Sequence, residues 1–544
     1  MLRKLSIAAG LLALSFQLAH AGDIVQGELA PVDVKPAVIV KGGHSAGKMT
    51  VGWFGTISPK WLDPLTASQA ISTTNNFKYL IQDALIKSMP QGLLTYSLAD
   101  KVEVSKDYRT FGFHLRAGLK FQDGEPLTSA DVKWTYEHYS GVNSHLFKDM
   151  TASVDTPDAQ TVVIHLKNST PDFLYLYSGA STTASIGWIV PEHYYEKVGA
   201  AGYLQHPVGA GPFKFVSQEG GTSLTLEAWD GYWRRAPGVK SLVFKSVQSP
   251  STGVAGVKTG ELDLFTNAIP LAREVMRDKG LRYDANLTGA WLLTFPNYED
   301  PASPFHDKRV REAVSLALNR AFLSQQGTEG AGKPFGNWVT PENPGVVNPP
   351  VPAYDPAKAK KLLAEAGYAN GLKIDGLMPF FVEPQTGERF LESIAAIGIH
   401  GSLKVVDAPQ YFATVGRGRK GFQSKSTILM FADQVAGPAS MMTSKYALCS
   451  SPVSFICEPK IEALWKDYNA TLDIAKRREI SGEIQKIIIG DYLVIPTYLN
   501  SFMQIVGPRV LPAGNAPDGQ GFHKYWAAPL TPWPWPWEDW QVKS

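Results

Sequence analysis

Apolar and polar positions alternate in two ways along the chain, and the two periods predict strands and helices in turn. Met49 to Gly55 is a short apolar run that predicts a strand, and Phe111 to Leu115 alternates as a half-buried strand does. The pair Asp123-Gly124 predicts a tight turn after this second strand. Thr128 and Asp131 then have the spacing of a capping box at the start of a helix. Strands mixed with helices indicate an α/β protein.

Helical spacing dominates the second half. Apolar residues from Val310 to Ala321 recur on one face and predict a single long helix that opens at Pro304. Asp355, Pro356 and Gly367 predict a second helix, because they suit its N-cap, its first position and its end. At 544 residues the chain is too long for one core, so we expect two or three domains.

Residues 1–21 have the pattern of a secretory signal peptide. Arg3 and Lys4 precede an apolar run from Ile7 to Leu18, and Ala19-His20-Ala21 suits cleavage. The apolar run is too short to span a bilayer. It is not followed by a Cys, so we expect a periplasmic protein without a lipid anchor. Its 52 basic and 50 acidic residues give no support to nucleic-acid binding.

The two cysteines of the chain, Cys449 and Cys457, are eight residues apart in the exported part. An oxidising compartment favours a disulfide between them, although two free thiols remain the alternative. Two sulfur ligands without a third argue against zinc. The 11 His residues show no metal-ligand spacing. We therefore expect no metal, no cofactor and no catalytic constellation.

Two short motifs near residue 45 suggest other functions. Gly43 to Gly47 matches the G-x-S-x-G of a hydrolase with Ser45 as nucleophile, and Gly42 to Lys48 matches part of a phosphate-binding loop. Both motifs require a helix directly after the loop. The strand predicted from Met49 argues against both functions.

Several longer motifs, in order, resemble those of the family-5 solute-binding proteins of ABC importers, which capture dipeptides, oligopeptides, nickel complexes and related solutes. They cover about residues 49–510. The densest is the stretch 92–139, with LADKVEVS, FHLRAGLKF, DGEPLT and TYE; others are LDP at 62–64, TVVIHL at 161–166, PVGAGPFKF at 207–215, LTLEAWDGYW at 224–233 and YDPAKAKKLLAEAGY at 354–368.

The resemblance implies a two-lobed periplasmic-binding-protein fold of type II, in its large three-domain subclass, with a hinge and a ligand cleft between the lobes. The resemblance and the residue patterns together predict the following parts: 1–21 signal peptide; 22–48 flexible leader, rich in Pro, Gly and Val; 49–85 first part of domain I; 86–206 domain II, in lobe 1; 207–300 second part of domain I; 301–500 domain III, the second lobe; 501–544 return to domain I and a Trp/Pro-rich tail, which the family pattern does not cover.

The resemblance also suggests ligand contacts. Peptide binders of the family hold the ligand's amino terminus with an Asp in a Gly-Trp-rich segment, and Asp433 occupies that place here. Phe431 stands where Trp is common, so the aromatic contact is expected there. A loop cap is the alternative role for Asp433.

Four weaker candidates complete this set. Trp291 and Asn297 lie on the strand before the helix that opens at Pro304, and this strand faces the cleft in the family, although an aromatic there also suits a core. Ser68 stands where oligopeptide binders present an acidic side chain. Arg417, in a basic loop, suits a carboxylate but also suits solvent.

The sequence thus predicts a receptor that captures a short peptide or amino-bearing solute by lobe closure and delivers it to ABC permease subunits. We expect a monomer. A sugar, an opine or a metal chelate is the alternative solute. The alternating Pro and Trp residues 532–537 predict an extended arm that packs on the protein itself or, in a scaffold protein, docks a partner.

Overall fold

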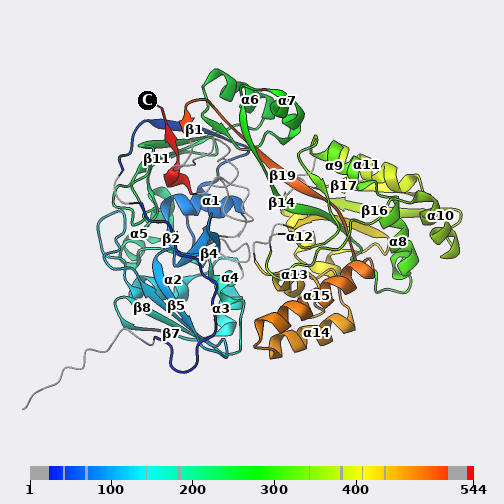
Figure 1. Cartoon of the computed structure of the whole chain (residues 1–544), viewed down its shortest axis with the longest axis horizontal. Helices are drawn as coiled ribbons and strands as arrows, with labels where there is room; N and C mark the ends of the chain where they lie inside the picture. The colour runs from blue at the N-terminus through cyan, green and yellow to red at the C-terminus, as the bar shows by residue number, and fades with distance from the viewer. Residues whose placement is uncertain are drawn as a thin grey trace, which may run out of the picture.

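The computed structural model describes residues 24–40, 43–67, 72–142, 144–179, 186–341, 343–379, 384–406, 408–433, 437–511 and 536–543. These residues form two lobes joined by two long strands, β14 (Arg282–Thr294) and β19 (Val494–Val506) (Figure 1). Lobe 1 holds the described residues of 24–281 and 507–543. Lobe 2 holds the described residues of 295–493. The expected two-lobed α/β fold is therefore confirmed.

One 11-stranded sheet runs through both lobes. Its strands, in sheet order, are β10 (Phe213–Glu219), β11 (Ser223–Ala228), β12 (Ser241–Ser246), β1 (Lys48–Trp53), β13 (Leu264–Phe265), β19, β14, β18 (Thr427–Asp433), β16 (Leu372–Met378) and β17 (Ile399–Val405), and β15 (Lys333–Pro334) pairs with β19. The antiparallel pair β14–β19 extends from Arg282↔Val506 to Thr294↔Val494. These two strands therefore carry both chain crossings between the lobes.

Lobe 1 contains a second, four-stranded antiparallel sheet in the order β5 (Ala99–Val104), β6 (Thr110–Leu115), β8 (Thr161–Leu166) and β7 (Thr151–Asp158). Phe111 and Phe113 of β6 are fully buried, as the alternating pattern predicts. The capping box of Thr128 and Asp131 is present at the start of the helix α2 (Ser129–His138). Its neighbours are α3 (Ser144–Met150) and α4 (Phe173–Tyr177), which follows β8.

The remaining elements are helices, 3-10 turns and the strands of small two-stranded sheets. In lobe 1 they are η1 (Pro59–Trp61), α1 (Ser72–Ile81), β2 (Asp83–Ala84), β3 (Ile86–Met89), β4 (Gly92–Tyr96), β9 (Trp188–Ile189), α5 (Glu192–Gln205), α6 (Pro250–Thr259), η2 (Ile269–Leu271), α7 (Ala272–Arg277), β20 (Val510–Leu511), η5 (Trp537–Asp539) and β21 (Gln541–Val542). In lobe 2 they are η3 (Pro304–His306), α8 (Lys308–Ala317), α9 (Arg320–Gly327), α10 (Pro356–Glu365), α11 (Pro384–Ala395), α12 (Ala408–Val415), η4 (Gly418–Gly421), α13 (Ala439–Tyr446), α14 (Pro459–Ala470) and α15 (Ile474–Gly490).

The prediction of a single long helix after Pro304 is wrong, because this segment forms two helices, α8 and α9. Leu318 has an extended conformation (φ −89°, ψ 111°) and ends α8. Asn319 then caps α9, because its side chain accepts a hydrogen bond from the Phe322 N–H. Apolar spacing alone does not detect this break.

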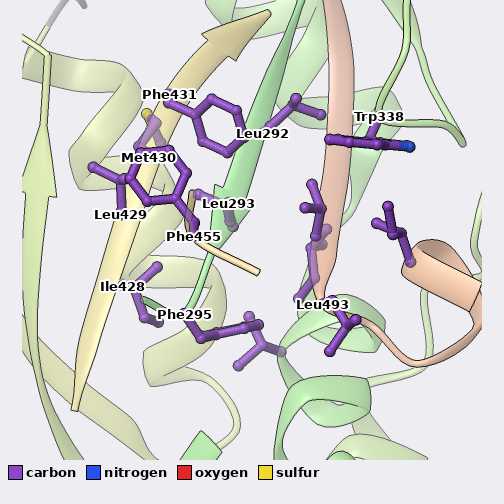
Figure 2. Close-up of a cluster of buried hydrophobic side chains, with 14 of the residues drawn as sticks. Leu292, Leu293, Phe295, Trp338, Ile428, Leu429, Met430, Phe431, Phe455 and Leu493 are labelled. Atoms are coloured by element: carbon purple, nitrogen blue, oxygen red, sulfur yellow. The ribbon is translucent and has the colours of Figure 1, made fainter. Parts of the chain in front are cut away.

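The core of lobe 2 lies between its sheet and its helices. Figure 2 shows Leu292 and Leu293 of β14 beside Leu429 and Phe431 of β18, and all four are at most 4% exposed. Strands buried on both faces explain why these segments read as continuous apolar runs.

The flexible leader expected for residues 22–48 is not what the structure shows for 24–40. Leu29 and Lys35 make β-bridges to Ser105 and Thr95 of lobe 1. The N–H groups of residues 24 and 25 both donate to Glu103 Oε2, at 2.6 and 3.0 Å. Backbone pairing of this kind fixes the segment along the edge of lobe 1.

The described end of the chain packs on the protein itself, as one of the two alternatives expected, but its conformation differs from the prediction. Residues 536–543 do not form an extended arm but the turn η5 and the strand β21, which pairs with β20. Trp537 and Trp540 are at most 2% exposed in the lobe 1 core, and Trp537 Nε1 donates to Asn76 Oδ1 at 2.8 Å. A partner therefore cannot dock on these two rings, which the protein itself covers. The earlier part of the Trp/Pro stretch lies outside the described residues.

Candidate functional site between the lobes

A cavity of about 130 Å³ lies at the seam where the two lobes meet. From lobe 1 it is lined by the N-terminal segment, the strands β4–β6 with their connection, and α4. From lobe 2 it is lined by the loop before α10, the start of α13, and the helices α14 and α15. The cavity depends on both lobes, because neither lobe alone supplies all of its walls.

Charges of opposite sign lie on the two sides of this cavity. Asp33 and Asp172 line it from lobe 1, and Arg477 and Arg478 line it from lobe 2. Arg477 is only 4% exposed, and its guanidinium lies 4.5 Å from the ring centre of Tyr468. Complementary charges of this kind favour the approach of the two lobes.

Local structure explains how these groups reach the seam. Asp172 is the N-cap residue of α4, but its side chain makes no cap hydrogen bond and is directed to lobe 2, where Ser440 and Tyr468 donate to it. Asp473 caps α15 by accepting a hydrogen bond from the Lys476 N–H at 2.8 Å. Arg477 and Arg478 then fall one helical turn after this cap.

Three tyrosine rings complete the polar part of the cavity wall. Burial, together with the nearby Asp172 and Asp33 carboxylates, raises the pKa of Tyr175 to about 12. Burial also raises the pKa of Tyr108 and of Tyr468, and Asp172 contributes to both increases. The three phenols therefore stay neutral at physiological pH, when each has an O–H that can donate a hydrogen bond.

The strand that carries Asp433 leads directly to this seam. β18 ends at Asp433, which pairs with Ala290 of β14. Four residues later the Gly437 N–H donates to Asn343 Oδ1 at 3.1 Å, and Pro438, which lines the cavity, precedes α13. The segment expected to hold a solute therefore continues into the cavity wall.

The family model for bacterial extracellular solute-binding proteins, family 5, middle region, matches residues 94–443. The matched range includes part of the wall that each lobe gives to the cavity, from Leu94 to Ser440, whereas Asp33, Arg477 and Arg478 lie outside it. The chain belongs to family 5 of the bacterial extracellular solute-binding proteins. Proteins of this family are transport receptors of ABC importers and not enzymes.

Individual relatives agree with this assignment. The glutathione-binding protein GsiB of Escherichia coli O1:K1 / APEC is 29% identical over 386 residues, which are 66% of this chain and 70% of that protein. Among solved structures, the substrate-binding protein CtaP of Listeria monocytogenes has a TM-score of 0.77 at 21% identity, over 92% of this chain and all of that one. The binding protein AgaA in complex with agropinic acid, from A. tumefacien R10, has a TM-score of 0.71 at 22% identity, over 92% and 99%.

Three of the predicted contact residues of this family 5 protein have packing or tethering roles. Phe431 is 4% exposed, and its ring lies 5.5 Å from that of Phe455 in the lobe 2 core (Figure 2). Trp291 is 6% exposed in the same core. Asn297 uses its Nδ2 to donate to the carbonyl oxygens of Phe422 and Ser424, at 3.1 and 2.7 Å. Burial and hydrogen bonding explain these three residues without a solute.

The other three predicted contacts have different outcomes. Arg417 is exposed at the start of η4, as expected of a solvated loop. Asp433 lies at the end of β18, and its contact with a solute stays a prediction. Ser68 lies outside the described residues. Sequence reasoning missed Asp172, Tyr468 and Arg477, whose proximity depends on tertiary contacts.

The two motif-based alternatives near residue 45 are wrong. The strand β1 begins at Lys48, directly after the loop, so neither a nucleophile elbow nor a phosphate-binding loop has its helix. The Ser45 hydroxyl instead donates to Asp230 Oδ1 at 2.9 Å. Cys449 and Cys457 form the expected disulfide. Within the described ranges, no His, Cys, Asp or Glu cluster could hold a metal ion, and no helix has the length and apolar character to cross a membrane.

Proposed function

We propose that this family 5 protein captures a short peptide or a peptide-like, amino-bearing solute between its lobes in the periplasm. The mature chain begins after residue 21, carries no lipid anchor, acts as a monomer and delivers the solute to permease subunits of an ABC importer. The observation that carries the proposal is the cavity at the seam, whose walls come from both lobes and carry opposite charges. A zwitterionic solute suits such a wall, because each of its charges finds an opposite one.

The relative GsiB, which binds glutathione, supports the solute class because its similarity covers 66% of this chain. Glutathione carries an amino group and carboxylates on a short peptide backbone, which are the groups that the proposed site would recognise. For Asp433 we propose contact with the solute's amino group. The position of Asp433 at the end of β18, next to the segment that enters the cavity wall, supports this role.

The domain division predicted from the sequence also stays a proposal, with domain III as lobe 2 and a hinge in the crossing strands. The two lobes would close by bending or twisting these strands. The 13-residue length of both β14 and β19 supports this role, because strands so long leave room between the lobes for small changes of twist.

Isothermal titration calorimetry tests the solute class. The mature chain, residues 22–544, is unfolded and refolded to release any retained solute and is then titrated with glutathione, with dipeptides, with agropinic acid and with sucrose. We expect micromolar or tighter binding of glutathione or a dipeptide. Binding of agropinic acid or sucrose alone would contradict the peptide-like class.

Asp433→Asn tests the amino contact, and Asp467→Asn, an exposed position on α14, is the matched control. Loss of the charge opposite a buried ammonium should weaken binding at least tenfold. The control should bind as the wild type does. If Asp433→Asn also binds unchanged, Asp433 is not part of the site.

A further inference from the structure

We infer that Asp172 is a positioning residue that holds the lobes in the closed arrangement and so sets the affinity for the solute through lobe closure. This inference rests on the proposed capture function. Asp172 belongs to lobe 1, yet both side-chain hydrogen bonds that its Oδ2 accepts come from lobe 2. Ser440 Oγ donates at 2.7 Å and Tyr468 Oη at 3.0 Å.

The two donors are held rigidly in lobe 2. Ser440 is 2% exposed at the start of α13, and Tyr468 is 5% exposed on α14. The ring of Tyr468 stacks on that of Trp465, with centroids 4.9 Å apart, and it also contacts the Arg477 guanidinium. Because both hydroxyls are fixed, the carboxylate meets them only when lobe 1 is docked against lobe 2.

Apolar contacts beside Asp172 belong to the same docking surface. Tyr175 and Leu176 of α4 are half-buried and pack against the cores of both lobes. Phe173 and Tyr177 of the same helix are buried in lobe 1 and anchor it there. The helix α4 is therefore fixed to lobe 1 by one set of residues and reaches lobe 2 with another.

The contact is also linked to the segment proposed to hold the solute. Ser440 lies seven residues after Asp433, and the backbone between them is tied to lobe 2 at two points. The Gly437 N–H donates to Asn343 Oδ1 at 3.1 Å, and the Ala439 N–H donates to the Pro344 carbonyl at 2.9 Å. The Ser440 donor is therefore fixed in lobe 2 close to the end of the strand that carries Asp433.

Opening of the lobes exposes the carboxylate and both hydroxyls to water, so the net gain from each hydrogen bond is modest. Hydrogen bonds to a charged group contribute about a tenfold factor each, and apparent affinity falls in proportion to the closed population that the protein can reach. Removing Asp172 should therefore lower the closed population, and the affinity with it, about tenfold or more.

The experiment measures both quantities in the mature chain. Spin labels at Cys residues introduced by Glu137→Cys and Lys466→Cys, both exposed and on opposite lobes, report the distance between the lobes with and without glutathione. Calorimetry gives the affinity for glutathione. The variants are Asp172→Ala, Tyr468→Phe and their combination. Asp149→Ala, an exposed carboxylate of lobe 1, is the matched control.

We expect Asp172→Ala and Tyr468→Phe to lose short-distance population and affinity together, with an unchanged melting temperature. The double variant should lose less than the sum of the two single effects, since both single variants remove the same Tyr468–Asp172 hydrogen bond. Tyr468→Phe keeps the stacked ring, so it tests the contact even if Asp172→Ala folds poorly. The control should match the wild type.

The possible outcomes separate the two proposals. If the wild type shows the short distance but binds neither glutathione nor the dipeptides, the solute class is contradicted, and the ligand-free distances alone then decide the role of Asp172. Equal closed populations in the wild type, Asp172→Ala and Tyr468→Phe would overturn the proposed role of Asp172. A wild type that never shows the short distance would overturn it as well, because a contact that does not form cannot set affinity.

Discussion

The ion pair between Arg234 and Glu538 anchors the end of the chain in the core of lobe 1, and its removal should destabilise that lobe strongly. Arg234 is 3% exposed and Glu538 is fully buried, with 2.6 Å between Nε and Oε1. The Tyr79 hydroxyl also donates to the Glu538 carboxylate, at 3.0 Å, but it does not neutralise the charge. We predict that Arg234→Met lowers the free energy of unfolding by about 3–5 kcal/mol, because it leaves a buried carboxylate without its counter-charge.

Urea unfolding followed by tryptophan fluorescence measures this loss, since Trp537 and Trp540 lie beside the pair. Arg309→Met is the matched control: it makes the same substitution in the pair with Asp307, where the side chains are 47% and 33% exposed. A solvent-exposed pair should contribute less than about 1 kcal/mol. Equal losses in the two variants would refute the reasoning, because they would mean that burial adds nothing to the cost of breaking the pair.

Two further predictions concern the interior of lobe 1. A Cβ on Gly209 would lie 2.2 Å from the Ile81 carbonyl oxygen, whereas a Cβ on Gly220 would meet nothing within 4 Å. Gly209→Ala should therefore lower the free energy of unfolding by about 1–3 kcal/mol in the same urea titration. Gly220→Ala, the control, should have little effect. Burial lowers the pKa of Lys78 to about 7, from 10.5 in the unfolded chain, although Asp63 opposes the shift. Between these two pKa values the unfolded chain binds more protons than the folded chain. The free energy of unfolding should therefore rise with pH by up to about 1.4 kcal/mol per pH unit. Urea titrations from pH 6.5 to 9 should show this rise in the wild type and a shallower rise in Lys78→Met.

Elements governed by neighbouring residues could be predicted from the sequence. Asp355 caps α10 by accepting a hydrogen bond from the Lys358 N–H at 2.9 Å, and Gly367 has the positive φ of 93° that ends such a helix. The capping box of α2 and the strand β1 could be predicted from the sequence in the same way. In each case the determining contacts lie within a few positions along the chain, where periodicity and capping rules apply.

Features that depend on distant contacts could not be predicted in this way. The alternating Pro and Trp residues predict an extended arm but do not show where it packs, and Trp537 donates to Asn76, 461 positions earlier. The N-terminal segment looked flexible because its partner, Glu103, is 79 positions from residue 24. Low periodicity identifies a segment without its own regular structure, but it does not show whether another part of the fold binds it.

The candidate site shows the same limit. The resemblance located the Asp433 strand, but alternation along β14 and β18 could not tell which aromatic rings face the cleft and which fill the core. Phe431 and Trp291 fill the core. The residues that meet across the seam, Asp172 and Ser440, are 268 positions apart, and each alone looks like an ordinary helix-start residue.

The placement of the chain ends explains why a few contacts at the seam can control closure. The described parts of both termini pack on lobe 1, through β-bridges at the N-terminus and the buried pair of Glu538 at the C-terminus. Within the described residues, the covalent connection between the lobes therefore consists of β14 and β19 alone. Lobe 2 is thus tied covalently to lobe 1 only along this strand pair. Asp172 and the opposite charges around it lie on the other side of the seam. A small rotation of the lobes about the strands would therefore make or break the hydrogen bonds that Ser440 and Tyr468 donate to Asp172. A receptor built in this way can convert the modest free energy of two hydrogen bonds into a large change in the population that holds solute.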